Sequence, residues 1–219
     1  MRVADRLAAV QERIRAAEER AGRAPGSVTL VAVSKRKPAT DIIAAYEAGQ
    51  RDFGENYVQE FAAKDTALGE LKHTRFHFIG KLQSNKSNKA ASLFDAIHTI
   101  DRVKLARRLG RSQKVLDVFV EVKLSHEPTK GGAAPQAVAE IVEAIRAAPS
   151  LRLRGLMTMP PWNSDPSRSR PYFRRLREIA AGHGLSGLSM GMSHDLEVAI
   201  DEGATHVRVG TAIFGKRDA

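Results

Sequence analysis

Lys35 is the residue best suited to covalent chemistry, because it follows an apolar, β-branched run and precedes two further cations. Residues 28–38 read VTLVAVSKRKP, with Arg36 and Lys37 directly behind Lys35. The run predicts a buried strand, and Pro38 suits the first turn of a following helix. Condensation with an aldehyde needs a neutral amine, which burial and neighbouring cations both favour. We therefore expect Lys35 to hold an aldehyde cofactor; a lysine that only extends to solvent is the alternative.

Two polar segments near the C-terminus could bind a phosphate group. Met192 and Ser193 precede a predicted helix, and serine is a common residue at the N-terminal cap of a helix. Gly210 allows a close approach to the backbone, and Thr211 offers a hydroxyl and an N–H at the start of a short helix. Each feature alone is compatible with ordinary capping. Together they predict a phosphate cradle if the fold brings the two segments together.

Arg208 lies two residues before Gly210 and, by strand alternation, on the same face as His206. Inside a barrel such an arginine needs a partner, either a ring nitrogen or a carboxylate of a structural ion pair. His77 lies in an aromatic run and is expected to pack in the core. The chain has no cysteine and its histidines lack metal-ligand spacing, so the sequence argues against a metal site.

Strand and helix patterns alternate along the chain. Residues 3–21 carry apolar side chains at three- and four-residue steps, which is typical of an amphipathic helix. Strands are expected at 28–34, 52–55, 75–79, 96–100, 117–124, 153–159, 185–191 and 205–209. Helical segments are expected after them at 39–48, 57–68, 84–93, 103–109, 136–147, 170–181, 194–202 and, as a short turn, 211–214.

Eight alternating units predict an α/β fold, a (β/α)8 TIM-type barrel, as a single domain over residues 1–219. The last helix is nearly missing, so the N-terminal helical segment 1–22 is expected to pack on the barrel in its place. A doubly wound open sheet is the alternative, although its G-x-G-x-x-G fingerprint is absent after the first strand.

In a barrel, the active site lies at the carboxyl ends of the strands. Lys35 and the two phosphate-binding segments would then meet at one rim, where the loops after strands seven and eight commonly bind phosphate. The other polar residues expected at this rim are Glu55, Asn56, Gly80, Lys81, Gln83, Ser125, His126, Thr129 and Lys130.

The composition is that of an ordinary globular protein, with 42% hydrophobic and 27% charged residues among 219. The net charge of +10 favours anionic partners such as phosphates, nucleic acid or acidic lipids. The densest arginine cluster, within 168–177, is only a weak reason to expect nucleic acid. No segment approaches the roughly 18 apolar residues of a membrane span, and the N-terminus has no signal-peptide core. We therefore expect a cytoplasmic protein without membrane contact.

A series of motifs over residues 28–217 resembles the pyridoxal phosphate homeostasis protein (YggS/PROSC) family. The motifs are VSK-x-KP at 33–38, FGENYVQE at 53–60, HFIG-x-LQ-x-NK at 77–86, LRGLMTM at 153–159, PYF at 171–173, LSMGMS at 188–193 with Asp195, and VRVGTAIFG at 207–215. The sequence departs from the family pattern at Lys123, where asparagine is usual, and at His194, which replaces a small or acidic residue. The loop at 125–132, including Lys130, is therefore where the resemblance says least.

The resemblance implies a barrel like the N-terminal domain of alanine racemase, with pyridoxal 5′-phosphate (PLP) held as a Schiff base on Lys35. It implies that Asn56 lies near the cofactor hydroxyl and that Arg208 is the partner of the pyridine nitrogen. An arginine there keeps that nitrogen unprotonated and weakens the ring as an electron sink. The phosphate cradle implied by the resemblance consists of Met192, Ser193, Gly210 and Thr211.

The function implied by the resemblance is the binding, buffering and delivery of PLP (a form of vitamin B6), with no established catalytic turnover. PLP-dependent apoenzymes are then expected partners, and a monomer is the expected state. A PLP-dependent amino-acid racemase is the alternative, but barrel-type racemases take one base from a second domain, for which this chain has no residues left. A Schiff-base aldolase without cofactor and a nucleic-acid binder are further alternatives.

Overall fold

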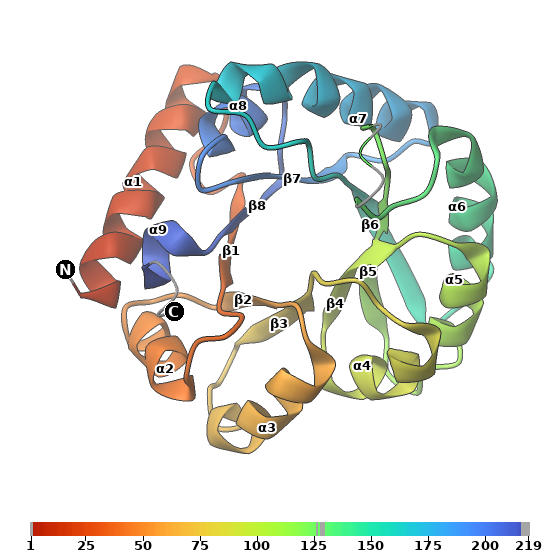
Figure 1. Ribbon diagram of the computed structural model, residues 1–219, viewed down its shortest axis with the longest axis horizontal. Coiled ribbons are helices and arrows are strands. Elements are labelled where there is room, and N and C mark those ends of the chain that lie inside the picture. Colours follow the sequence, from red (N-terminus) through yellow and green to blue (C-terminus); the bar gives the residue numbers. More distant parts are fainter. Residues whose placement is uncertain (1, 126, 128–129, 216–219) are drawn as a thin grey trace.

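The computed structural model describes residues 2–125, 127 and 130–215 and shows a closed barrel of eight parallel strands (Figure 1). β1 pairs with β2 on one side and with β8 on the other, where Leu30 lies opposite Val207. The predicted (β/α)8 TIM-type barrel is therefore confirmed, and the doubly wound open sheet is wrong. The strands are β1 (Thr29–Val33), β2 (Asp52–Glu55), β3 (Arg75–Phe78), β4 (Ala96–Ile100), β5 (Leu116–Glu121), β6 (Leu151–Met157), β7 (Gly187–Met192) and β8 (His206–Val209).

A ring of helices surrounds the strands (Figure 1). The helices are α1 (Val3–Arg20), α2 (Ala39–Glu47), α3 (Val58–Leu68), α4 (Ser87–Leu93), α5 (Val103–Leu109), α6 (Val138–Arg146), α7 (Arg170–Gly182), α8 (Leu196–Asp201) and α9 (Thr211–Phe214). Short 3-10 turns precede three of them, at Ser84–Lys86, Pro135–Ala137 and Pro166–Ser169. None of the described helices is both long and apolar enough to cross a bilayer.

α1 takes the place of the eighth helix, as expected, because α9 has only 4 residues. The apolar face of α1 is buried at Leu7, Val10, Ile14 and Ala17, and the helix packs against α2, α8 and α9. The segment at the N-terminus therefore completes the ring at the point where β1 and β8 join.

Alternate residues of each strand face either the apolar core between strands and helices or the interior of the barrel. On β5, Val118 and Val120 belong to the large apolar core between strands and helices, whereas the ring of Phe119 lies against His98 and His206. Since neighbouring residues of a strand point to opposite faces, Phe119 and the two histidines lie inside the barrel. The interior of the barrel is thus polar as well as aromatic.

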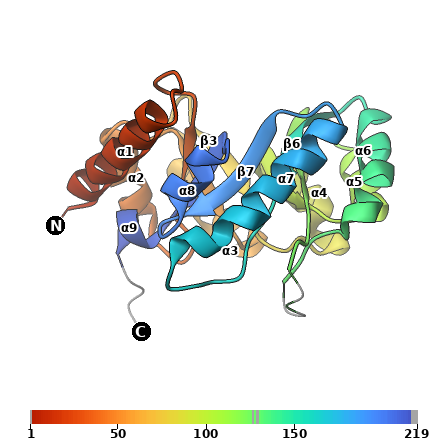
Figure 2. The ribbon, with the colours of Figure 1, turned by 90° about the horizontal axis from the view of Figure 1, so that it is seen from above.

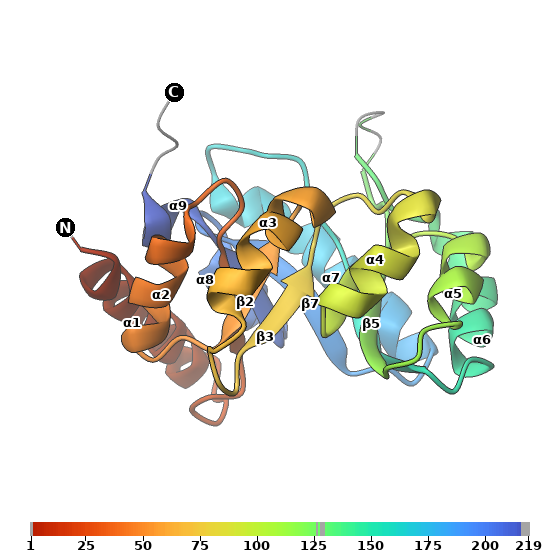
Figure 3. The same ribbon diagram turned by 90° about the horizontal axis from the view of Figure 1, so that it is seen from below.

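The parallel strands place their carboxyl ends on one side of the barrel. Figures 2 and 3 show α9 and the loop between β6 and α7 on that side, and the turn between α1 and β1 on the other. We call the side with the loops that follow the strands the carboxyl-end rim, and the opposite side the amino-end rim.

Candidate functional site

Lys35 lies in the turn between β1 and α2, two residues beyond the end of the strand. The turn is closed by a hydrogen bond from Lys37 N to Ser34 O of 3.0 Å, and Arg36 has a left-handed φ of 59°. The side chain of Lys35 is exposed. Burial is therefore not a cause of reactivity here, contrary to the expectation from the sequence, and Lys35 stands within reach of a ligand at the carboxyl-end rim.

Side chains of β2 and α3 hold this turn in place. Buried Ser34 donates its Oγ proton to Glu55 Oε1 at 2.8 Å, and Arg36 N donates to Glu60 Oε1 at 2.6 Å. Lys64 Nζ joins the two carboxylates, at 3.2 Å from Glu55 and 2.6 Å from Glu60. Burial raises the pKa of Glu55, and Lys64 and Ser34 oppose that rise. These bonds hold the strained backbone at Arg36, so Lys35 is presented from a fixed turn.

The two segments predicted to bind phosphate meet at the carboxyl-end rim. Thr211 Oγ1 lies 3.4 Å from Ser193 Oγ, to which it donates. Gly210 packs on the end of β1, because a Cβ at Gly210 would lie 3.3 Å from Val33 O. Lys35 follows Val33 by two residues, so the lysine turn adjoins the segment at Gly210, which in turn contacts Ser193 through Thr211. The structure therefore brings together the parts that the sequence separates.

The turn after β7 is fixed by Asp195 rather than by Ser193. α8 begins at Leu196 and its N-terminal cap position is Asp195, so the expectation that Ser193 caps this helix is wrong. Asp195 is buried; its Oδ1 accepts from Met192 N and its Oδ2 from Ser169 Oγ, each at 2.8 Å. The hydroxyl of Ser193 is consequently not engaged in capping and faces Thr211.

The helix α1 supports this region from outside. Arg13 Nη2 donates to Ser193 O at 3.0 Å, and its guanidinium pairs with Glu197 at 2.7 Å. Arg6 Nε donates to Ile213 O of α9 at 2.6 Å. Two arginines of one helix thus bind the backbone of Ser193 and the backbone of α9, the helix that begins at Thr211.

Arg208 is buried inside the barrel, on the face predicted from strand alternation. Its Nη1 donates to Ser189 Oγ at 2.7 Å and its Nη2 to Thr158 O at 3.0 Å. Burial lowers its pKa to about 10, and Glu121 is the strongest influence in the opposite direction. The side chain is therefore a cation at neutral pH, and its hydrogen bonds go to uncharged acceptors rather than to the carboxylate of an ion pair.

Ser189 begins a series of largely buried hydrogen bonds that was not predicted from the sequence. Ser189 Oγ lies 2.8 Å from His98 Nδ1, His98 Nε2 lies 2.9 Å from His77 Nδ1, and His77 Nε2 lies 2.9 Å from Asp52 Oδ1. His77 is buried, as expected, but it is part of a polar network. Within the described part of the chain, no three His, Asp or Glu side chains form a group that could hold a metal.

Glu121, at the carboxyl end of β5, is a candidate residue that sequence reasoning missed. Its side chain is buried, and burial raises its pKa to about 7 with a further contribution from Asp101. Arg208 and Lys81 act in the opposite direction. The turn at 131–132 lies over this carboxyl, because a Cβ on Gly131 would lie 3.4 Å from either oxygen. The signal was alternation from Phe119, which places Glu121 inside the barrel.

Asn56 follows β2 and carries a buried Oδ1 that has no hydrogen-bond partner among the described residues. Its backbone is fixed by Gly80, where a Cβ would lie 2.1 Å from Asn56 O. A buried unpaired amide oxygen is costly, so Asn56 is suited to accept a hydrogen bond from a ligand. Ser125 and Lys130 lie in the loop after β5, and the predicted residues His126 and Thr129 fall outside the described residues.

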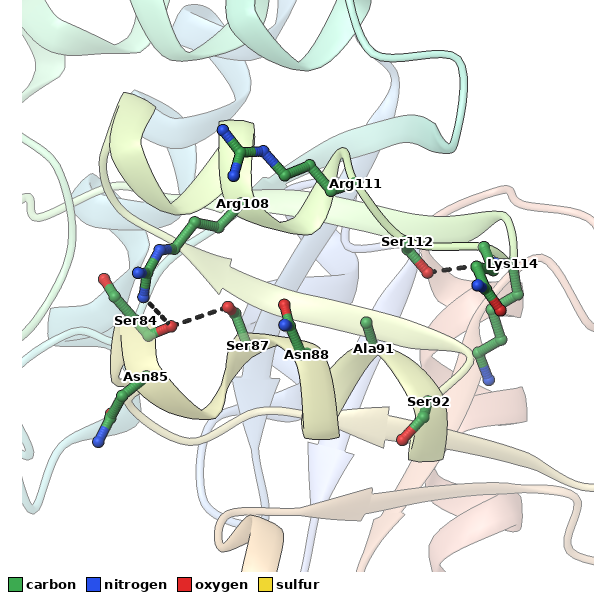
Figure 4. Close-up of a pocket in the computed structure, with 11 residues that line it drawn as sticks. Ser84, Asn85, Ser87, Asn88, Ala91, Ser92, Arg108, Arg111, Ser112 and Lys114 are labelled. Carbon is green, nitrogen blue, oxygen red and sulfur yellow. Dashed lines mark hydrogen bonds between the residues drawn. The ribbon is translucent and has the colours of Figure 1, made fainter.

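A surface pocket of about 770 Å³ lies apart from this site, between α4 and α5 (Figure 4). The side chain of Arg108 points toward Ser84 there, and its Nη1 donates to Ser84 O at 2.6 Å. Lys114 Nζ lies 3.3 Å from Asp95. None of the predicted site residues lines this pocket, and two of its cations already have partners within the protein. The pocket is therefore not the predicted ligand site.

Comparison with known proteins gives matches over nearly the whole chain. The family model described as "Alanine racemase, N-terminal domain" matches residues 6–218. The pyridoxal phosphate homeostasis protein of Pseudomonas aeruginosa is 46% identical over 222 residues, covering 99% of this chain and 96% of that protein. The protein of the same name from Escherichia coli K12 is 45% identical over 227 residues, covering 99% and 97%.

Solved structures agree with these matches. PipY of Synechococcus elongatus PCC7942 without PLP has a TM-score of 0.88 at 39% identity, covering 98% of this chain and 100% of that chain. The same protein with PLP bound has a TM-score of 0.86 at 38% identity, with coverage of 98% and 100%. Alanine racemase from Corynebacterium glutamicum, at a TM-score of 0.66 and 18% identity, covers 97% of this chain and 62% of that chain, and shares the fold.

Proposed function

Because the chain belongs to the pyridoxal phosphate homeostasis protein family, we propose that it binds PLP, buffers it and delivers it to PLP-dependent apoenzymes. PLP is held as a Schiff base on Lys35, and the protein catalyses no turnover of its own. The proposal places this function in the cytoplasm, in a monomeric barrel domain that spans residues 1–219 and needs no nucleic acid.

The residues at the carboxyl-end rim fit PLP. Support comes from three features: an exposed lysine on a fixed turn, a glycine packed on β1 beside it, and the unpaired Oδ1 of Asn56. Asn56 Oδ1 then accepts a hydrogen bond from the cofactor hydroxyl. The phosphate is held by hydroxyl and backbone N–H groups in the cradle of Met192, Ser193, Gly210 and Thr211.

Arg208 sets the electronic character of the site in this proposal. PLP supplies an aldehyde for amine capture and a ring that can withdraw electrons. A guanidinium has only donors, so a ring nitrogen facing Arg208 must accept a hydrogen bond and stay unprotonated. An unprotonated ring nitrogen withdraws electrons less strongly than a protonated one, which is compatible with a carrier that does not need strong electron withdrawal.

The observation that carries the proposal is the meeting of the lysine turn with the segments after β7 and β8. The test is the absorbance spectrum of purified protein with added PLP, followed by borohydride reduction and peptide mapping. We expect a yellow band and a reduced adduct on Lys35. Lys35→Ala should lose both, whereas Lys37→Ala, in the same turn, should keep them. A yellow band retained by Lys35→Ala after dialysis would refute this assignment.

A racemase assay separates the carrier from its alternative. We expect the protein loaded with PLP to leave the optical rotation of L-alanine unchanged over hours. A loss of rotation that is absent in Lys35→Ala would establish the racemase instead.

A further inference from the structure

We propose that Ser189, His98, His77 and Asp52 are positioning residues for Arg208, linked to it in a hydrogen-bond relay of fixed direction. The relay crosses the interior of the barrel from Arg208 to Asp52 at the amino-end rim. Its effect on the cofactor rests on the proposed function, whereas its existence can be tested on the protein alone.

The contacts form one unbroken series. The distances are 2.7 Å from Arg208 Nη1 to Ser189 Oγ, 2.8 Å from Ser189 to His98, 2.9 Å from His98 to His77, and 2.9 Å from His77 to Asp52. Ser189 and His98 are completely buried, and His77 is 1% exposed. The five members come from β8, β7, β4, β3 and β2, so the series crosses the barrel rather than following one strand.

When both imidazoles are neutral, the carboxylate at the end of the series determines which atom donates in every hydrogen bond. A carboxylate can only accept, so His77 Nε2 carries a proton toward Asp52. A neutral imidazole has one N–H, so His77 Nδ1 accepts, and His98 Nε2 must donate to it. His98 Nδ1 is then an acceptor and takes the hydroxyl proton of Ser189. Ser189 has no second proton, which leaves its oxygen to accept from Arg208.

Neutral imidazoles suit this interior. The charged and titratable groups that act on His98 are His77, His206, Arg208 and Arg75, and burial together with these groups holds the pKa of His98 well below its usual range. The proposed relay has both imidazoles neutral, which puts one cation at one end and one carboxylate at the other.

The relay restricts what Arg208 can do. With Nη1 bonded to Ser189 and Nη2 to Thr158 O, the guanidinium plane is fixed by two acceptors. Because the proton of Ser189 points to His98, this hydroxyl cannot turn and donate toward a ring nitrogen. The donor offered to the cofactor is therefore always the charged arginine, and Asp52 maintains that arrangement from the far side of the barrel.

The first test needs no cofactor. We expect the imidazole ¹⁵N shifts of uniformly labelled protein, recorded without PLP at pH 7, to show His77 and His98 as neutral Nε2–H tautomers. Exposed His73 serves as the internal reference. An imidazolium, or an Nδ1–H tautomer, at either His77 or His98 would overturn the relay, whether or not the protein binds PLP.

The second test breaks the relay at its remote end. Asp52→Ala removes the acceptor of His77, so we expect His77 and His98 to populate mixed tautomers. In PLP-loaded protein, the yellow band should shift and PLP should be lost roughly three- to tenfold faster, the effect of about one hydrogen bond. Glu70→Ala is the matched control, because Glu70 is an exposed acid in the turn between α3 and β3, also at the amino-end rim, and is not a member of the relay.

The two variants together decide between positioning and mere packing. Glu70→Ala should leave the tautomers and the PLP band unchanged. If Asp52→Ala keeps the tautomer of His98, or if both variants change it equally, the relay does not position Arg208. Failure of the Lys35 adduct experiment would instead refute the proposed function and leave the tautomer result standing.

Discussion

In the proposed function, Lys35 and Arg208 contact PLP from different environments, one exposed and one buried. Lys35 is exposed on a turn that carboxylates hold from outside, so an aldehyde can reach its amine without any movement of the barrel. Arg208 is buried and has two fixed acceptors, so its charge has one orientation. An exposed lysine together with a rigidly held arginine is what the proposed uptake and release of PLP would need.

Glu121 should make the stability of the protein depend on pH. Its pKa rises from 4.5 to about 7 on folding, so the folded protein holds this proton more tightly than the unfolded chain does. Stability contributed by protonated Glu121 is therefore present below pH 4.5 and is lost as the pH rises toward 7. Glu121→Gln should raise the free energy of unfolding by about 1–3 kcal/mol at pH 8 and by less at pH 5.

Urea unfolding at the two pH values measures this difference. Glu140→Gln, an exposed acid on α6, is the control and should show no such pH dependence. An equal effect of Glu121→Gln at both pH values would show that Glu121 is ionised in the folded protein throughout.

Site residues were predictable from the sequence when their position followed from the order of the strands, and not when it depended on a partner far away in the chain. Lys35, Gly210 and Thr211 were predictable because residue type, neighbours and strand order suffice to place them at one rim. The relay was not, because His98 and Ser189 are 91 residues apart and a histidine in an apolar strand looks like core. Pairing within a barrel interior depends on strand stagger, which the sequence pattern does not reveal.

At the scale of elements, the order of strands and helices was predictable and their ends were less so. The helices at Val103–Leu109 and Thr211–Phe214 lie where the pattern placed them. β5 ends at Glu121 instead of 124, because the chain beyond it turns toward its own loop, where Val122 bridges Ala133. The spacing of apolar residues does not reveal a hydrogen bond between a strand end and its own loop, so this strand end could not be predicted.

α1 should stabilise the bound state of PLP through Arg13. Arg13→Ala removes the donor to Ser193 O and the pair with Glu197, so the turn after β7 loses its outer support. We expect PLP to dissociate roughly three- to tenfold faster, with stability lowered by about 1 kcal/mol. Arg15→Ala on the same helix breaks only an exposed pair with Glu12 and should change neither quantity. Equal dissociation rates for the two variants would mean that α1 does not support the phosphate segments.

At the scale of the whole molecule, much of the basic charge has a structural use. Glu202, with a side chain 5% exposed, binds Arg170 at 2.9 Å and both Arg174 and Arg177 at 3.2 Å. These arginines are most of the cluster that suggested nucleic acid, and they join α7 to the end of α8. Since these arginines pair within the protein, the net charge of +10 is weak evidence for an anionic partner such as nucleic acid.

Closure of the barrel predicts that the molecule unfolds as one unit. Leu7 lies on the buried face of α1, the helix that packs against α2, α8 and α9. Leu7→Ala should therefore lower the free energy of unfolding by about 2–5 kcal/mol. In a closed sheet this loss cannot stay local, because each strand depends on both neighbours. In Leu7→Ala, backbone amides of β4 and β5, on the far side of the barrel, should exchange hydrogen at least 10-fold faster than in the unsubstituted protein. The amides of β8 should speed up by about the same factor. Glu12→Ala, exposed on the same helix, should leave all of them unchanged. Faster exchange confined to β1 and β8 would show that the barrel opens at its junction while the rest stays folded.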